Sequence, residues 1–138
     1  MKLIIDTNII ISALIRDSIS RRIIVKSEWK FYYPEKAFHE IEEHKNLILK
    51  KSGMKETEYI QLLSYLLNHI IIVPENQVRN KLKEANNTMG KIDIDDVVFL
   101  ATALSLQDSR IWSDDADFDK QNKVKVLKTK DVIRLFME

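Results

Sequence analysis

The chain opens with a short apolar segment that ends on an acid, Leu3-Ile4-Ile5-Asp6-Thr7-Asn8. A short apolar run rich in β-branched residues is typical of a buried strand, here expected over 2–5. Asn8 is a good N-cap residue, so a helix is expected to begin near it. Asp6 therefore lies where a buried strand stops and a helix starts. Open parallel sheets bind their ligands at this edge, which makes Asp6 a candidate for a functional site.

Strands and helices are expected to alternate along the rest of the chain. Further strands are predicted over 31–33, 69–73, 110–112 and 124–127. Further helices are predicted over 18–28, from Pro34 to about Lys51, and over 55–68, 75–86 and 97–106. A terminal helix is predicted with Thr129 as its cap, and 86–90 is the clearest loop. In the helix over 55–68 a broad apolar face is predicted, formed by Ile60, Leu63, Tyr65, Leu66 and Leu67. This alternation predicts the α/β class, as a three-layer α/β/α sandwich with a central, mostly parallel sheet.

Length and composition predict one globular domain over residues 1–138. The chain has 138 residues, of which 45% are hydrophobic and 31% charged, as in ordinary globular proteins. It has no Cys, which excludes disulfides and thiolate metal sites. No apolar run approaches the roughly 18 residues of a membrane span, and no signal-peptide pattern precedes the first strand. A cytoplasmic protein that does not enter a membrane is the resulting expectation.

The net charge of +1 argues neither for nor against binding to nucleic acid. The distribution of the cations is more informative than their sum. They gather in three segments, 16–26, 45–55 and 120–130. Such runs are either solvated faces or phosphate-binding surfaces.

Other acids recur at element boundaries, at Glu40, at Asp93, Asp95 and Asp96, and at Asp114, Asp115 and Asp117. If they converged on Asp6, the carboxylates would repel one another unless a hard cation lay between them. Oxygen ligands are those that Mg²⁺ and similar ions prefer. The pattern therefore predicts a divalent-metal site.

Position on the predicted helix singles out Asp96 within the second group. At helical spacing it lies in line with Phe99, Leu100 and Ala103, on an entirely apolar stripe. A carboxylate on a buried stripe needs a partner, which a metal ion would supply. The structural alternative is that these acids stabilise the helix N-terminus, with Asp93 and Asp96 as a capping-box-like pair.

The remaining acids are less clearly distinguished. Glu40 and Glu42 border the apolar arc of their helix on opposite sides, and periodicity does not choose between them. The three acids at 114, 115 and 117 follow a strand directly. They form either a solvated acidic turn or a loop that a cation holds together.

Four segments of the chain, in order, resemble motifs of the PIN-domain family, nucleases that include the VapC-type toxins of bacterial and archaeal toxin–antitoxin modules. Asp6-Thr7-Asn8 is similar to the opening motif, and Pro34-Glu35 with Glu40-Ile41 to the helix-borne glutamate motif. The segment 93–103 is the most specific, since the family has alanines five and seven positions after an aspartate, as Ala101 and Ala103 follow Asp96. The segment 111–118 is similar to the closing motif, with Ser113 where Thr is more usual.

The resemblance implies a PIN-like fold, RNA as substrate, Mg²⁺ or Mn²⁺ as cofactor, a homodimer, and an antitoxin protein as partner. It selects Glu40 over Glu42. It implies Asp6, Glu40, Asp96 and Asp115 as catalytic and metal-binding acids, with Asp6 and Asp96 as the most direct ligands. The extra acid Asp114 makes the fourth position ambiguous, and Asp117 is the second choice there. Supporting roles fall to Asn8, Ser113, Asp117 and Asp93.

Several other functions fit parts of the pattern. A phosphotransfer domain also has an Asp after a strand, but the phosphatase type wants a second Asp two residues on, where this chain has Asn8. A DNA-directed nuclease and an RNA-processing nuclease share the same metal chemistry. A non-catalytic RNA-binding or assembly module would have no reason to bear so many mutually repelling acids.

Overall fold

In the computed structural model, which describes residues 1–89 and 93–138, the strands form one parallel sheet with β1 at its centre. The order is β3-β2-β1-β4-β5, and every pairing is parallel. Ile5 at the end of β1 pairs with Trp112 at the end of β4, so both strands stop at the same edge. The strand bounds are β1 Lys2–Ile5, β2 Lys30–Pro34, β3 Ile70–Val73, β4 Ser109–Trp112 and β5 Val126–Leu127.

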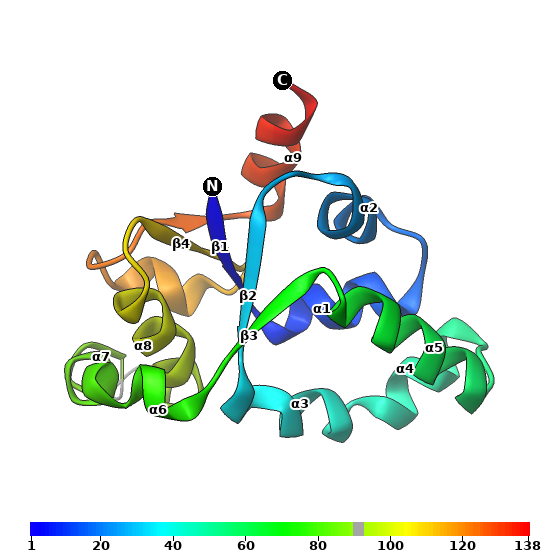
Figure 1. Ribbon diagram of the computed structural model, residues 1–138, viewed down its shortest axis with the longest axis horizontal. Helices are drawn as coiled ribbons and strands as arrows, with labels where there is room; N and C mark the ends of the chain where they lie inside the picture. Colours follow the sequence, from blue (N-terminus) through cyan, green and yellow to red (C-terminus); the bar gives the residue numbers. More distant parts are fainter. Residues whose placement is uncertain (90–92) are drawn as a thin grey trace.

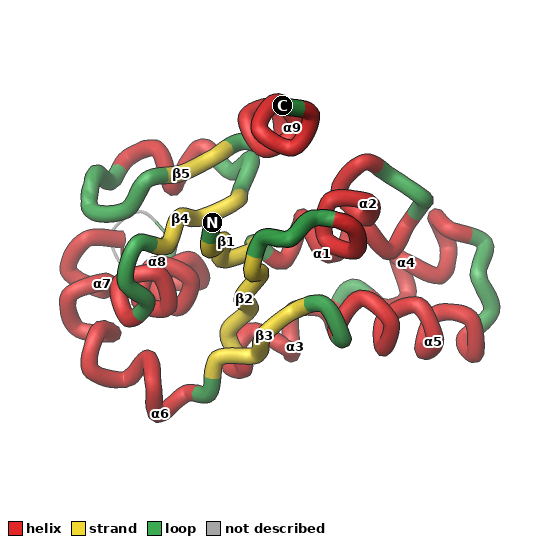
Figure 2. Tube along the Cα trace, turned by 45° about the horizontal axis from the view of Figure 1, so that its top comes forward, coloured by secondary structure: helices red, strands yellow, loops and turns green. Residues whose placement is uncertain are grey.

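Helices cover both faces of the sheet (Figures 1 and 2), which confirms the predicted three-layer α/β/α sandwich. One face carries α1 Thr7–Ile15, α2 Ile19–Lys26, α4 Lys45–Ser52, α5 Glu56–Leu67 and α9 Thr129–Met137, and the other α6 Glu75–Val78, α7 Leu82–Met89 and α8 Val97–Ser105. The short helix α3 Phe38–Glu43 follows β2 at the carboxyl edge of the sheet. Single 3₁₀ turns complete the chain: η1 Glu35–Ala37, η2 Arg79–Lys81, η3 Ile94–Asp96 and η4 Ala116–Lys120.

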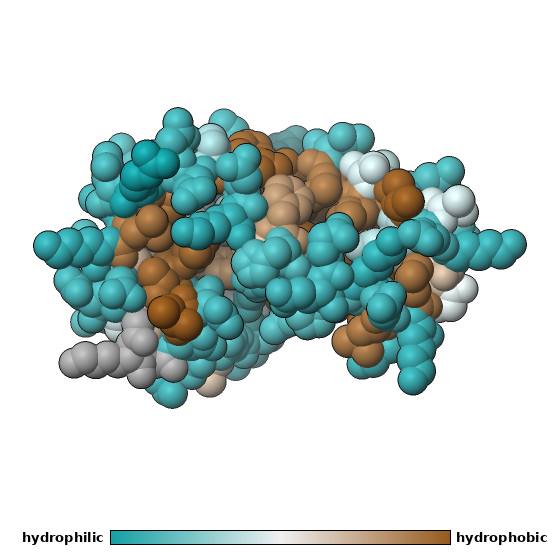
Figure 3. Space-filling view, turned by 90° about the horizontal axis from the view of Figure 1, so that it is seen from below, coloured by the Kyte–Doolittle hydropathy of each residue, from teal (hydrophilic) through white to brown (hydrophobic). Residues whose placement is uncertain are grey.

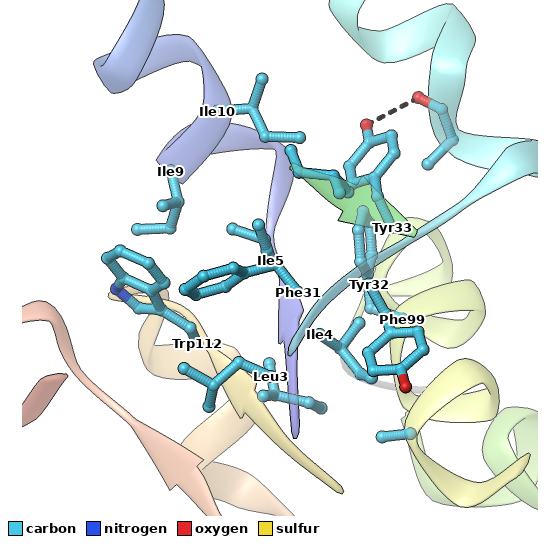
Figure 4. Close-up of a cluster of buried hydrophobic side chains, with 14 of the residues drawn as sticks. Leu3, Ile4, Ile5, Ile9, Ile10, Phe31, Tyr32, Tyr33, Phe99 and Trp112 are labelled. Atoms are coloured by element: carbon cyan, nitrogen blue, oxygen red, sulfur yellow. Dashed lines mark hydrogen bonds between the residues drawn. The ribbon is translucent and has the colours of Figure 1, made fainter. Parts of the chain in front are cut away.

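The core forms where β1, β2 and β4 meet α1 and α8. Leu3, Ile4 and Ile5 are fully buried, because the central strand has helices on both sides. Aromatic rings from neighbouring strands fill the space around them (Figure 4), with Phe31 of β2 6.2 Å from Trp112 of β4 between ring centroids. Each such side chain contributes about 1.5–3 kcal/mol by leaving water. The core therefore fixes the strand ends that carry the acids.

The predicted continuous helix from Pro34 to about Lys51 is wrong. Pro34 is the last residue of β2, and the segment after it is divided into η1, α3 and α4. The break between α3 and α4 lies at His44, whose backbone N–H bonds to Ile41 O instead of continuing the α-helical pattern. The ring Nδ1 of His44 donates instead to Glu40 O at 2.7 Å. The side chain thus takes the acceptor that the helix would have used.

Other boundaries also differ from the sequence-based prediction. The predicted loop over 86–90 is helical as far as Met89, because Ala85 and Met89 are buried on one side of α7; Gly90 lies outside the described residues. The predicted helix over 75–86 is divided into α6, η2 and α7. On α5, Tyr59 and Leu66 are buried, but Ile60 and Tyr65 are 54% and 49% exposed, so the predicted apolar face is only partly used by the core.

The predicted cap at Thr129 is one residue out of place, since Lys128 is the N-cap and Thr129 is the first residue of α9. In the part of the chain that the structure describes, none of the helices combines the length and the apolar character required to traverse a bilayer.

Two buried tyrosines provide a matched test of this packing. Tyr33 donates from its hydroxyl to Ala37 O at 2.9 Å (Figure 4), and the same hydroxyl lies 2.7 Å from Thr7 Oγ1. Tyr59 is 2% exposed, and its hydroxyl has no hydrogen-bond partner among the described residues. We expect Tyr33→Phe to lower the free energy of unfolding by about 1 kcal/mol, and Tyr59→Phe to leave it unchanged or raise it by up to about 1 kcal/mol.

Urea denaturation of the two variants beside the wild type measures both effects. Each substitution removes one oxygen and keeps the ring, so the difference between the variants isolates the hydrogen bonds. A loss of stability in Tyr59→Phe equal to that in Tyr33→Phe would contradict the assignment.

Candidate metal centre

Asp6 lies at the carboxyl edge of the sheet, between the ends of β1 and β4. Its side chain is 6% exposed and accepts a 2.6 Å hydrogen bond from Ser113 Oγ, which follows β4. Asp6 itself occupies the N-cap position of α1, but it makes no side-chain cap hydrogen bond. Asn8, which the sequence predicted as the cap, is the second residue of α1 and is exposed. Asp6 is thus placed by strand pairing, and its carboxylate faces the site.

Burial raises the pKa of Asp6. The hydrogen bond from Ser113 opposes this effect, and the nearby charge of Asp115 adds to it. Backbone N–H groups of Asn8 and Thr7 also favour the charged form, although neither has the geometry of a cap hydrogen bond. The carboxylate of Asp6 is therefore held in an environment that resists its charge.

Four aspartates from two other segments form the centre of the site, and we call them the acidic cluster. Asp93, Asp96, Asp115 and Asp117 each present a carboxylate oxygen, and these oxygens all lie within 4.8 Å of one another. Asp93 is the N-cap of η3 and Asp96 its last residue, just before the buried helix α8, while Asp115 and Asp117 lie at the start of η4 after β4. Two elements that are adjacent in space thus bring together acids that are distant in sequence.

Local hydrogen bonds hold three members of the acidic cluster in place. Asp93 accepts from the backbone N–H of Asp95 at 2.9 Å, and Asp115 accepts from that of Asp117 at 2.9 Å. Ser113 Oγ accepts from the backbone N–H of Asp115 at 3.0 Å. Ser113 therefore links Asp6 to the loop that carries Asp115, and it is fully buried.

Asp96 is the member whose charge is least compensated. It is 7% exposed, and its Oδ2 atom is buried without a hydrogen-bond partner among the described residues. Burial, followed by the charges of Asp93, Asp115, Asp6 and Asp117, raises the pKa of Asp96 to about 8. A buried, unpaired carboxylate oxygen beside other carboxylates is costly unless a cation is bound. The cluster thus has the donor set that a hard divalent cation requires.

Glu40 lies near Asp6, and a chain of hydroxyl groups from Thr7 and Tyr33 contacts its carboxylate. Thr7 Oγ1 donates to Glu40 Oε1 at 2.9 Å and lies 2.7 Å from the Tyr33 hydroxyl. Burial is the main cause that raises the pKa of Glu40, and the charges of Asp6 and Asp95 add to it. Glu42 is exposed, and its charge acts instead on Lys45 and Tyr59. Of the two glutamates that periodicity left open, Glu40 is the one that faces the acids.

The hydroxyl chain has more short polar contacts than hydrogens when Glu40 is ionised. Tyr33–Ala37, Tyr33–Thr7 and Thr7–Glu40 are three such contacts, whereas the two hydroxyl groups supply two hydrogens. A proton on Glu40 would complete the chain, which agrees with its raised pKa. A cation near Glu40 would favour the ionised form instead.

Asp114 is turned away from the acidic cluster. Its carboxylate accepts from the backbone N–H of Thr129 at 2.8 Å and from the Thr129 hydroxyl at 2.6 Å. Thr129 Oγ1 in turn accepts from Trp112 Nε1 at 3.0 Å. Asp114 thus attaches the loop after β4 to the start of α9, which leaves Asp115 and Asp117 free to face the cluster.

A cleft of about 400 Å³ opens beside these acids. Its lining includes the acids Asp6, Asp114 and Asp115 and the polar residues Asn8, Ser12 and Arg16. The carboxyl ends of β1 and β2 point downward in Figure 1, and Figure 3 views the molecule from that side. Polar side chains cover most of this face, with apolar side chains in separate patches between them. The cleft is therefore suited to a polar ligand.

Most of the sequence-predicted residues come together, but not as one set. Asp96 and Asp115 are in the acidic cluster, and Asp93 and Asp117, expected only in support, are there too. Asp6 and Glu40 border it and are linked to each other electrostatically. Ser113 supports Asp6, as predicted by its hydroxyl, but it is too buried to contact a phosphate. Sequence reasoning missed the role of Thr7 and Tyr33, since each reads locally as a cap or core residue.

Comparison with known families gives one match: the model of the PIN domain matches residues 4–134. A search of curated proteins found none that matches the chain.

We expect the metal-free protein to lose stability as the pH rises from about 4 to about 8. A carboxyl whose pKa is higher in the folded chain binds more protons when folded, so its stabilisation is complete below the unfolded pKa of about 3.9 and is lost as the pH rises through the folded pKa. For Asp96 the folded value is about 8. The loss should be on the order of 1–3 kcal/mol, because each pKa unit corresponds to about 1.4 kcal/mol and water screens part of the shift.

Urea denaturation in EDTA at pH 5 and pH 8 measures this difference. Asp96→Asn should flatten the pH dependence and exceed the wild type in stability at pH 8. Asp119→Asn, which removes an exposed acid outside the cluster, should keep the wild-type dependence. Equal pH dependence in the wild type and Asp96→Asn would show that Asp96 is not the group that titrates.

Proposed function

Because the chain belongs to the PIN-domain family, whose members are generally nucleases, we propose that it is a divalent-metal-dependent endoribonuclease that hydrolyses RNA phosphodiester bonds. The observation that carries this proposal is the acidic cluster with its unpartnered Asp96 oxygen, placed at the carboxyl edge of the sheet. Ligands of open parallel sheets bind at this edge. The polar cleft beside the cluster gives a substrate access to it.

The residues that would hold the cation are Asp96 and Asp115, with Asp93 and Asp117 around them and Asp6 beside them. Mg²⁺ or Mn²⁺ fits this all-oxygen donor set. When bound, such a cation would lower the pKa of water and stabilise negative charge on the phosphate and the leaving oxygen. This chain lacks any Cys, which agrees with a hard rather than a thiophilic metal.

The surrounding residues would hold and orient these acids. Ser113 keeps Asp6 in place through its 2.6 Å hydrogen bond, and Thr7 does the same for Glu40. Asp6 and Glu40 would then orient water at the border of the cluster. Asn8 is exposed in the cleft and would donate to a phosphate oxygen. Outer partners of this kind typically change metal affinity or activity about 10–100-fold when removed.

The proposed biological role is that of the toxin in a toxin–antitoxin module. Its support is the resemblance of four segments to motifs of the PIN-domain family, which includes VapC-type toxins. On this proposal the protein acts as a homodimer that a separate antitoxin restrains. An RNA-processing enzyme would use the same site and would differ from a toxin in its effect on the cell.

We expect the purified protein to cleave single-stranded RNA with Mg²⁺ or Mn²⁺ and to stop when EDTA is added. Asp6→Asn and Asp96→Asn should each lower the cleavage rate by about 100-fold or more, since each removes a charge that faces the cation. Asp119→Asn is the matched control and should retain the wild-type rate. Rates are measured on a labelled RNA and on DNA of the same sequence.

Each alternative gives a distinct result in this assay. Cleavage that persists in EDTA or in both Asp→Asn variants would exclude the metal mechanism. Cleavage of DNA alone would indicate a DNA-directed nuclease. Binding of RNA without cleavage under all metal conditions would indicate a non-catalytic module.

For the toxin role, induced expression of the wild type in a bacterium should arrest growth, and Asp96→Asn should not. Co-expression of a short upstream gene for a DNA-binding protein should restore growth, because an antitoxin would block the cleft or the metal centre. Normal growth with an enzyme that cleaves RNA in vitro would favour the processing role. Colony counts with and without inducer measure the effect.

A further inference from the structure

A row of polar residues runs along one side of the otherwise buried helix α1, away from the acidic cluster. Asn8 and Ser12 lie four residues apart on one face of α1, and Arg16 is the extended residue at the end of the helix that lines the same two hollows. All three are exposed, whereas Ile9, Ile10, Ile11, Ala13 and Leu14 are buried. The exposure of this row on a core helix is a feature that packing does not require.

Two hollows share this row. The first is the cleft of about 400 Å³ that also contains Asp6 and Asp115. The second, of about 340 Å³, is lined by Asn8, Ser12 and Arg16 again, and by Lys51 at the end of α4. A chain that lies in the cleft at the acids can therefore continue over Ser12 toward Arg16 and Lys51.

The charges around the acidic cluster differ sharply between its two sides. On the η4 side two cations are paired with acids, Lys120 with Asp117 at 3.1 Å and Lys128 with Asp119 at 2.9 Å. Arg16 and Lys51 form no ion pair with any of the residues that the structure describes. A polyanion in the cleft would therefore be attracted toward α1 and α4 by two cations whose charge is not already compensated by an ion pair.

We infer that Asn8, Ser12, Arg16 and Lys51, which we call the α1 strip, bind the phosphodiester backbone of the nucleotides on one side of the scissile bond. This inference rests on the proposed function and adds the path of the substrate. The guanidinium of Arg16 can hold a phosphate through two parallel hydrogen bonds. Ser12 and Asn8 are donors of the kind that contact phosphate and sugar.

The composition of the strip indicates how it would bind RNA. No aromatic side chain lines either hollow within the described part of the chain, so base stacking is not offered there. Hydrogen bonds to phosphate and sugar carry no sequence information. The strip therefore supplies affinity and the direction of the strand, and its ligand is single-stranded RNA of any sequence.

The test is the salt dependence of RNA binding by the cleavage-deficient Asp96→Asn protein in Mg²⁺. For single strands, log affinity falls with log salt with a slope of about −0.7 for each phosphate that the protein neutralises. Arg16→Gln and Lys51→Gln, each added to Asp96→Asn, should each make the slope shallower by about 0.7, and together by about 1.4. Fluorescence anisotropy with a short labelled RNA measures the slope.

Two matched variants control for the removal of charge alone. Lys50→Gln alters the neighbour of Lys51 on the same helix, and Arg22→Gln alters an exposed arginine of α2; neither residue lines the two hollows. Both should keep the original slope. Arg16→Lys should also keep it, since the charge is retained. Shortening the RNA from one end, and not from the other, should abolish the effect of Lys51→Gln.

The outcomes separate this inference from the proposed nuclease function. An unchanged slope in Arg16→Gln and Lys51→Gln, or an equal change in the controls, overturns the α1 strip even if the wild type cleaves RNA. A shallower slope limited to the strip supports it even if the wild type cleaves nothing, in which case the nuclease function falls alone. Absence of any RNA binding overturns the strip, and cleavage by the wild type then tests the function separately.

Discussion

Repulsion among carboxylates at the carboxyl edge of the sheet is the constraint that organises the rest of the site. Asp93, Asp96, Asp115 and Asp117 lie close together, and Asp6 adds its charge to that of Asp96. Hydroxyl and backbone N–H groups relieve part of the repulsion, at Asp6 through Ser113 and at Asp115 through Asp117. One carboxylate oxygen of Asp96, Oδ2, has no hydrogen-bond partner among the described residues. The charged form of the arrangement is therefore destabilised unless a proton or a cation neutralises part of it.

The topology of the sheet explains why the acids meet where they do. The chain builds β1, β2 and β3 outward on one side and then returns to place β4 on the other side of β1. Such a switch leaves a crevice between the loops that follow β1 and β4. Asp6 and Ser113 come from these two loops, and the buried helix α8 brings Asp96 to the same place. Short loops at this edge are therefore enough to assemble the centre.

The surroundings of the centre are asymmetric in a way that suits a long anionic substrate. On one side lie acids and cations that are already paired, and on the other lies a polar row that ends in Arg16 and Lys51. A cation at the cluster would attract a phosphate to the centre, while the α1 strip would bind the backbone beyond it. On the η4 side Lys120 does pair with Asp117 of the acidic cluster, whereas Arg16 and Lys51 form no ion pair with any of the described residues.

The α/β class, the position of Asp6 at a strand end and the burial of Asp96 could all be predicted from the amino-acid sequence, because each depends on the periodicity of nearby residues. Resemblance to a family, not periodicity, selected Glu40. Tertiary packing brought Asp93 and Asp117 together with Asp96 and Asp115 and directed Asp114 toward Thr129. These outcomes depend on which way a side chain points and which distant atom it meets. Such contacts arise when strands and helices pack, and no local pattern of residues contains them.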